Sequence, residues 1–244
     1  MNNIDKFYTD VNIFFESEKI DFMNHGYCPT SSLLNDKNET FKNQKSLYLS
    51  LFESVDTNNK VILDIGCGRG GGIKTLDKYF NFKEIYACDI NEKNIQYCKN
   101  NNPSNINYKT LNALNLDYPD NFFDIVTNIE SSHCYENPSL FFLEIKRILK
   151  PNGVFLYADC GETIKSFHNF FYLFKNIIYK NITENVQKSC FEDITNFNSL
   201  NIKQEIKDWL VFITKNKYDE YLFKKDEYIF YKCFNDNERD GKYE

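Results

Sequence analysis

The sequence predicts an α/β protein with a mostly parallel sheet. From residue 61 onward, short apolar segments typical of strands alternate with segments whose apolar residues recur at helical spacing. A Gly-rich turn follows the first of these strands, and an acidic residue ends the second. Strands that alternate with helices indicate βαβ units, in which a crossover helix joins two parallel strands.

Five strands are expected before residue 160. They span 61–65, 84–89, 107–110, 123–128 and 154–159. Helices are expected after the Gly-rich turn to about Tyr79, after the second strand to about Asn100, and over residues 139–149. The Pro-Asn-Gly segment at 151–153 indicates a turn before the fifth strand.

The two flanks of this core are also expected to be ordered. Apolar residues at helical spacing predict a helical segment within residues 1–55. After residue 160 we expect an aromatic-rich helix at 163–175, a strand at 177–182, helices over 184–215 that include Trp209, and a closing strand at 227–234. No internal repeat or linker is visible. We therefore expect one domain over 1–244, with an N-terminal helical part (1–55), a core (56–160) and a C-terminal part (161–244).

The composition excludes several classes of protein. A chain of 244 residues can bury a core without disulfides or a structural metal. The net charge of −6 disfavours nucleic-acid binding. The eight Cys include no CxxC pair and no metal-ligand pattern stands out, so we expect no metal site. No signal peptide or apolar run of about 18 residues is visible, which predicts a cytoplasmic protein without membrane insertion.

The Gly-rich turn predicts a site for a ligand that carries a ribose. A strand, a turn with Gly66, Gly68 and Gly71, and a helix together place backbone N–H groups around a polar ligand. Asp89 ends the next strand, where a carboxylate can accept both ribose hydroxyls. The same glycines satisfy the dinucleotide pattern G-x-G-x-x-G, so NAD remains an alternative, as does a turn that serves only the fold.

The segment from Asp64 to Gly70, D-I-G-C-G-R-G, resembles motif I of the class I S-adenosylmethionine-dependent methyltransferases. The resemblance covers roughly residues 55–160. It implies a Rossmann-like, mostly parallel seven-stranded sheet with helices on both faces and an N-terminal helical lid. It also implies S-adenosylmethionine as the cofactor and S-adenosylhomocysteine as the product. Because a carboxylate at Asp64 suits a cationic ligand and would repel a pyrophosphate, it favours this cofactor over NAD. A helix cap is the alternative for Asp64.

The resemblance also assigns cofactor-binding residues. Asp89 resembles the family's ribose-binding acid, and Asn112-Ala113 resembles the segment that holds adenine. Asn24-His25-Gly26-Tyr27 matches a loop that covers the cofactor in a subgroup of the family. The cofactor-binding residues implied in this way are Tyr27, Asp64, Gly66, Cys67, Gly68, Asp89, Ile90, Asn112, Ala113, Asn128 and Glu130.

A Glu-Ser-Ser-His-Cys-Tyr segment at 130–135 follows the strand at 123–128. In an open α/β sheet the ligand crevice lies at the carboxyl ends of the strands. The segment is similar to a subgroup that methylates hydroxyls on lipids, polyketides and related natural products, including phthiotriol-type enzymes. A neutral imidazole can take the proton of a hydroxyl acceptor. We therefore predict His133 as the general base, with a histidine that only shapes the pocket as the alternative.

The acceptor is expected to be a hydrophobic small molecule, because aromatic residues recur on the segment 163–175. The predicted pocket residues are His25, Tyr135, Phe167 and Phe171, although aromatics at this spacing also suit a core helix. The protein is expected to be a monomer or homodimer. An N- or C-methyltransferase, an NAD-linked oxidoreductase and a catalytically silent methyltransferase-like module remain open as alternatives.

Overall fold

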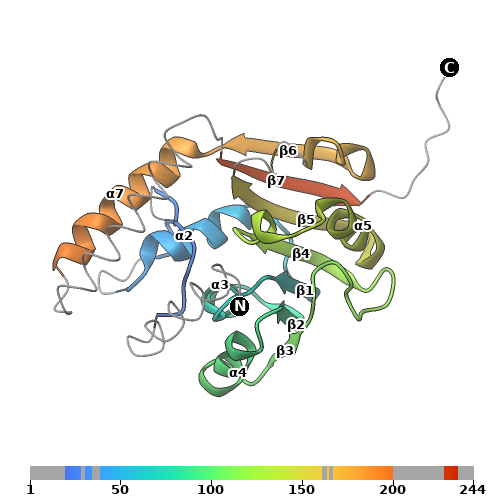
Figure 1. Cartoon of the computed structure of the whole chain (residues 1–244), viewed down its shortest axis with the longest axis horizontal. Helices are drawn as coiled ribbons and strands as arrows, with labels where there is room; N and C mark the ends of the chain where they lie inside the picture. The colour runs from blue at the N-terminus through green and yellow to red at the C-terminus, as the bar shows by residue number, and fades with distance from the viewer. Residues whose placement is uncertain are drawn as a thin grey trace.

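The computed structural model describes residues 20–28, 31–34, 39–160, 164, 167–199 and 228–235. Within them, one seven-stranded sheet has the strand order β3-β2-β1-β4-β5-β7-β6 (Figure 1). The strands are β1 Lys60–Ile65, β2 Phe82–Asp89, β3 Ile106–Thr110, β4 Phe123–Ile129, β5 Leu149–Cys160, β6 Lys175–Asn181 and β7 Tyr228–Asn235. β1 to β5 pair in parallel, and β7 runs antiparallel to β5 and β6. This confirms the predicted mostly parallel seven-stranded sheet.

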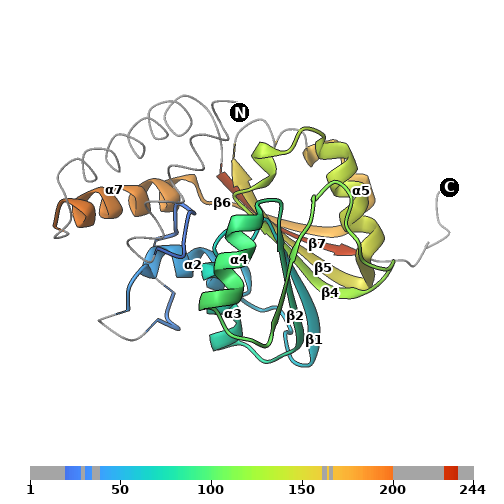
Figure 2. The same cartoon turned by 60° about the horizontal axis from the view of Figure 1, so that its bottom comes forward.

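Helices cover both faces of the sheet (Figure 2). They are α2 Lys42–Leu51, α3 Gly71–Tyr79, α4 Glu92–Asn101, α5 Pro138–Ile148 and α7 Thr183–Ser199, with the short 3-10 turns η1 Ser132–Cys134 and η2 Phe171–Leu173. The residues of α2, α3, α4 and the start of α7 share one hydrophobic cluster, and those of α5 belong to a second cluster on the other face. Successive strand residues alternate between them, as Ile125 and Val126 of β4 do. Burial on both faces explains why the central strands are apolar runs.

The C-terminal part differs from the expected helix at 163–175. Phe167 and His168 are helical, but the chain turns at Asn169 and Phe170, and β6 begins at Lys175. A second difference is that β5 begins at Leu149 and runs through the expected turn at 151–153. Asn152 adopts a left-handed conformation there, and the register with β4 shifts between Phe123 and Ile125. The expected helices beyond residue 199, with Trp209, lie outside the described residues.

Arg147 fastens the connection between β3 and β4 to α5. Its guanidinium donates to the carbonyls of Leu116 and Tyr118 at 2.8 and 2.7 Å, and to the carboxylates of Glu144 and Asp120. Glu144 in turn accepts the N–H of Leu116 at 2.8 Å. A planar guanidinium has five N–H donors, and these contacts engage all of them. The segment that carries Asn112 and Ala113 is therefore held from its far end.

Because α3 packs closely against α2, we expect Gly72 to tolerate no side chain without a loss of stability. A β-carbon built on Gly72 would lie 1.9 Å from Cζ of the Tyr48 ring. We expect Gly72→Ala to lower the free energy of unfolding by about 1–3 kcal/mol, because the ring has to move. Denaturant unfolding measures this, with Lys99→Ala on an exposed face of α4 as the control, expected within about 0.5 kcal/mol of the wild type. An unchanged midpoint for Gly72→Ala would contradict the packing described here.

Candidate functional site

The glycine turn joins the carboxyl end of β1 to α3. Gly66, Gly68 and Gly70 have φ values of 71°, 53° and 81°, which favour glycine over residues with a side chain. Close approach adds a second reason at Gly66, since a β-carbon there would lie 2.2 Å from Oγ of Ser131. The turn is therefore compact, and it brings β1 close to the loop that follows β4.

Asp89 ends β2 beside this turn. One carboxylate oxygen accepts the N–H of Gly68 at 2.8 Å, and the other accepts the N–H of Asn91 at 2.8 Å. Burial raises the pKa of Asp89, while these two backbone donors oppose the rise. The carboxylate thus fixes the turn and the start of α4, in the position that the sequence predicted for a ribose-binding acid.

Asp64 lies one strand position before the end of β1 and is 1% exposed. Parallel register places Thr127 of β4 beside it, and Oγ1 of Thr127 donates to one carboxylate oxygen at 2.7 Å. The other oxygen is buried without a hydrogen-bond partner. Burial, with a smaller contribution from the charge of Asp89, raises the pKa of Asp64 to about 7 against the lowering effect of Thr127. An orphaned buried carboxylate oxygen is costly unless a ligand supplies a donor or positive charge.

A segment that we call the strap, residues 20–28, crosses the glycine turn. At one end, the carbonyl of Ile20 accepts from Nε of Arg69 at 2.9 Å, and the carbonyl of Asp21 accepts the N–H of Gly71 at 3.2 Å. Further along, Met23 lies over the turn, with Cε 3.0 Å from a β-carbon built on Gly68. The strap is therefore placed to cover a ligand held at the turn.

The predicted adenine-binding residues lie next to the end of β3. Asn112 is exposed, and its amide oxygen accepts the N–H of Leu114 at 2.9 Å, while Ala113 is buried. Ile90 follows Asp89 and is 70% exposed. Asn112 and Ile90 thus offer a polar and an apolar surface on neighbouring strand ends.

Asn128 links β1 to the loop after β4. Its amide nitrogen lies 3.0 Å from the carbonyl of Ile65, 2.6 Å from Oγ of Ser131 and 3.0 Å from the hydroxyl of Tyr135. Its amide oxygen is buried without a partner. Tyr135 packs its ring on Phe141 with 4.9 Å between centroids. These contacts fix where the loop 130–135 leaves the sheet.

His133 pairs with Asp159, which sequence reasoning did not assign to the site. Nδ1 of His133 lies 2.8 Å from Oδ1 of Asp159, near the end of β5. Asp159 is 0% exposed and also accepts from Oγ of Ser132, the N–H of His133 and the N–H of Cys160. Because the Asp159 carboxylate is surrounded by donors, it accepts a hydrogen bond from Nδ1–H of His133. Nε2 of His133 is then left to bond another group. The available signal was an acidic residue at the end of the neighbouring parallel strand.

The pairing shifts the protonation of His133. Burial favours the neutral ring, but hydrogen bonds and negative charge from Asp159, and a hydrogen bond with Cys134, raise the pKa of His133 to about 10. The imidazole side chain nevertheless keeps 35% exposure. His133 is therefore a partly exposed imidazole whose protonated form is stabilised by Asp159.

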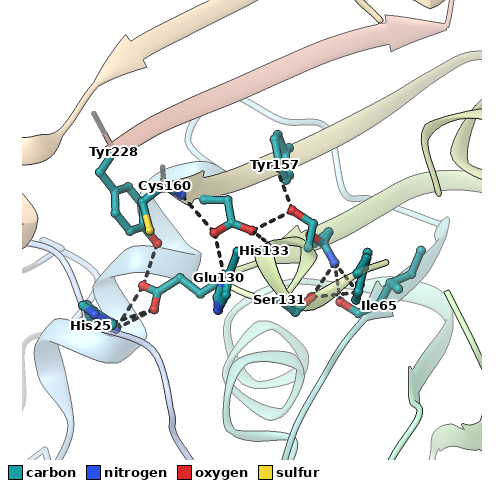
Figure 3. A network of polar contacts seen from close by, with 12 residues as sticks. His25, Ile65, Glu130, Ser131, His133, Tyr157, Cys160 and Tyr228 are labelled. Carbon is teal, nitrogen blue, oxygen red and sulfur yellow. Dashed lines mark hydrogen bonds and ion pairs between the residues drawn. The ribbon is translucent and has the colours of Figure 1, made fainter. Parts of the chain in front are cut away.

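Glu130 contacts the strap rather than His133. Its carboxylate accepts the N–H of His25 at 2.9 Å, pairs with Nδ1 of His25 at 2.8 Å and accepts the hydroxyl of Tyr228 at 2.6 Å (Figure 3). Burial would raise its pKa, but the charge and hydrogen bonds of His25 and the Tyr228 hydroxyl lower it to about 2. His25 and Glu130 are thus brought together, and both lie beside the loop that carries His133.

The remaining predicted site residues are packed against other parts of the protein. The Tyr27 hydroxyl accepts from Nζ of Lys180 at 3.0 Å, and its ring stacks on Phe230. Cys67 is buried beneath the turn. Phe167 is fully buried among aromatic residues of the α5-side core, including Phe142. The side chain of Phe171 lies outside the description.

The described residues contain neither a membrane-spanning helix nor a cluster of metal ligands. None of the helices in those residues is long and apolar enough to cross a membrane. In the same part of the chain, no three His, Cys, Asp or Glu side chains are grouped so that they could hold a metal ion.

Comparison with known proteins identifies a family that part of the chain resembles. Residues 63–157 match a family model described as a methyltransferase domain. A fatty-acid O-methyltransferase of Mycolicibacterium smegmatis is 33% identical over 148 residues, which are 59% of this chain and 54% of that protein. A phthiotriol/phenolphthiotriol dimycocerosates methyltransferase of Mycobacterium tuberculosis is 32% identical over 147 residues, with the same coverage. The chain spans about half the length of the curated relatives it matches.

The fold also matches a solved structure. A phosphoethanolamine N-methyltransferase 2 of Haemonchus contortus, solved with S-adenosylhomocysteine, superposes with a TM-score of 0.66 at 19% identity, over 78% of this chain and 52% of that one. S-adenosylmethionine is the cofactor of this family. Residues 63–157 are therefore similar to the methyltransferase-domain family, and the chain has the Rossmann-like fold of the class I S-adenosylmethionine-dependent methyltransferases.

Proposed function

We propose that this protein transfers a methyl group from S-adenosylmethionine to an oxygen of a hydrophobic small molecule, with His133 as the group that faces the acceptor. The observation that carries the proposal is the His133–Asp159 pair, 2.8 Å apart, at the carboxyl edge of the sheet. The two curated relatives support the class of acceptor, since their names specify a fatty acid and phthiotriol/phenolphthiotriol dimycocerosates.

The chain's own residues suit the cofactor. Asp64 offers an orphaned carboxylate oxygen to a cationic amino-acid tail, and Asp89 offers carboxylate oxygens to a ribose. Ile90 and the Asn112-Ala113 segment offer an apolar surface and an amide to adenine. When bound, the sulfonium supplies an activated methyl group. The proposal also includes the other predicted cofactor residues, which are Tyr27, Gly66, Cys67, Gly68, Asn128 and Glu130. Tyr27, Asn128 and Glu130 are positioned beside the cofactor site by the contacts described above.

His133 acts as the general base when the acceptor is a hydroxyl. Asp159 holds the Nδ1 proton, so Nε2 can accept the hydroxyl proton while the acceptor oxygen becomes the nucleophile. The raised pKa of His133 means that the ring has to lose its proton before it can act. A positive charge beside the ring lowers its pKa, so occupation of the cofactor site favours the neutral base.

A carboxylate acceptor is a second candidate, and the raised pKa of His133 favours it. A carboxylate is already ionised at neutral pH and needs no base. A cationic His133, oriented by Asp159, would bind and position it through a charge-assisted hydrogen bond. The fatty-acid O-methyltransferase of Mycolicibacterium smegmatis supports this candidate.

A reducing, cytoplasmic environment is part of the proposal. The eight cysteines, all among the described residues, form no disulfide bond with one another. Proteins that stay in the cytosol keep their thiols reduced.

The pH dependence of methyl transfer separates the two acceptors. With a long-chain alcohol or phenol, we expect kcat to rise with pH until His133 is neutral in the complex. With a fatty acid, we expect kcat/KM to fall as pH rises through the same pKa, because the imidazolium is lost. Initial rates between pH 6 and 10, measured as S-adenosylhomocysteine formed, give both profiles.

Matched variants test the assignment to His133. With the alcohol, His133→Ala is expected to lower kcat about 10²–10⁴-fold. His168→Gln removes an imidazole that bonds Tyr231 instead, and it should retain the wild-type rate. If His133→Ala keeps most of its turnover on a hydroxyl acceptor, His133 is not the base.

The raised pKa of Asp64 predicts that a proton is released when the cofactor binds. Its pKa of about 7 leaves it largely protonated at pH 6, and an adjacent ligand cation favours the carboxylate. We expect release of up to one proton for each S-adenosylmethionine bound at pH 6, with affinity that increases toward pH 7 and then levels off. Calorimetry in two buffers of different ionisation enthalpy measures this.

Asp64→Asn is the control for that experiment, because it keeps the shape but cannot titrate. Its proton release should disappear. Proton release that persists unchanged in Asp64→Asn would show that another group responds to the cofactor.

A further inference from the structure

Glu130 is the only carboxylate among the described residues that binds both the strap and β7. It follows β4 directly and adopts a left-handed conformation with φ 50°, which is uncommon for a residue with a side chain. Its side chain is only 6% exposed. The strained backbone therefore places a buried charge between segments that are distant in the sequence.

The donors to Glu130 all come from those other segments. His25 of the strap supplies its N–H and Nδ1, and Tyr228, the first residue of β7, supplies its hydroxyl. His25 is also held from α7, where Oγ of Ser189 donates to its carbonyl at 2.7 Å. Figure 3 shows the Glu130 carboxylate between His25 and Tyr228.

The other end of the strap is held by Arg69 and Gly71 through its backbone carbonyls, and by the side chain of Asp21. Asp21 pairs with Lys74 at 3.1 Å and accepts the hydroxyl of Tyr97 at 2.7 Å, but the Lys74 side chain is 42% exposed. Exposed ion pairs contribute little, whereas breaking a buried pair leaves a charge without compensation. Loss of the Glu130 carboxylate would therefore leave the donors of His25 and Tyr228 without their acceptor.

We propose that Glu130 is a latch that holds the strap closed over the glycine turn and thereby limits the rate at which the cofactor enters and leaves. The proposal rests on the proposed function, because it takes the glycine turn as the cofactor site. Glu130 is a positioning residue here and acts through His25. Met23 lies over Gly68 between the two ends of the strap, so a ligand at the turn is enclosed while the latch holds.

A latch and a direct cofactor contact differ in their kinetics. Loss of a direct contact raises the dissociation rate constant and leaves association unchanged. Loss of a latch raises the open fraction of the strap, so association and dissociation both become faster. The dissociation constant then changes much less than either rate constant.

The test is stopped-flow binding of S-adenosylhomocysteine to the full chain and to Glu130→Gln. Glutamine keeps one acceptor oxygen but presents an amide N–H₂ to the donors of His25 and Tyr228. We expect both rate constants to rise about 10-fold, the magnitude of losing one hydrogen bond to a charged group. The dissociation constant should stay within about 3-fold of the wild type.

Three further variants keep the result interpretable. Ser189→Ala and Tyr228→Phe each remove one hydrogen bond of the latch without touching the glycine turn, and smaller increases in both rate constants are expected. Asp124→Asn is the matched control. The Asp124 carboxylate likewise accepts a backbone N–H, that of Val61, and pairs with a cation, Lys150. It lies at the amino-terminal ends of β1 and β4, away from the glycine turn. Its binding kinetics should equal those of the wild type.

The outcomes distinguish the latch from the function on which it rests. If the wild type does not bind S-adenosylhomocysteine, the proposed function fails. If it binds and Glu130→Gln, Ser189→Ala and Tyr228→Phe exchange it at the wild-type rates, the latch is wrong. If only dissociation from Glu130→Gln becomes faster, Glu130 contacts the cofactor directly and the latch is also wrong.

Discussion

A buried carboxylate is stable only when hydrogen-bond donors surround it, and the arrangement of the site depends on the donors that surround Asp159. Asp159 has no solvent exposure, and water cannot satisfy it. Its donors come from Ser132, the backbone and ring of His133, and Cys160, while Tyr157 in turn bonds to Ser132. The loop after β4 is therefore folded around the end of β5. The orientation of His133 follows from this, because the same carboxylate that needs a donor fixes which ring nitrogen faces it.

The local features of the site were predictable from the sequence, and the contacts between distant segments were not. The apolar run at 61–65, the glycines after it and Asp89 identify the turn, because each has a local physical reason. The partner of His133 is 26 positions away, and only the parallel register of β4 and β5 brings it close. Glu130 was expected at the cofactor, and nothing in the sequence indicated that a left-handed backbone would also bring its side chain to the strap. Such a pairing depends on where two loops meet, which no periodicity in the sequence specifies.

The same limit explains the differences in the second half of the chain. Aromatic residues at helical spacing predicted a helix to residue 175, but Phe167 is buried in the core and the chain turns soon after His168. The edge position of β6 beside β7 is a tertiary arrangement that competes with local helical preference. Similarly, the Pro-Asn-Gly segment at 151–153 is absorbed as an irregularity at the start of β5, because the parallel pairing with β4 extends to Leu149.

Electrostatics at the carboxyl edge favours a cationic ligand. Four carboxylates lie at or just beyond the ends of β1, β2, β4 and β5. Glu130 and Asp159 are each paired with a histidine, but no ion pair neutralises Asp64 or Asp89 among the described residues. The pKa values of both are raised, so each favours a proton or another positive charge. A sulfonium with an ammonium tail supplies that charge. If the cofactor binds at this edge as proposed, loss of the methyl group would leave a neutral sulfur, and the weaker attraction would favour release of the product.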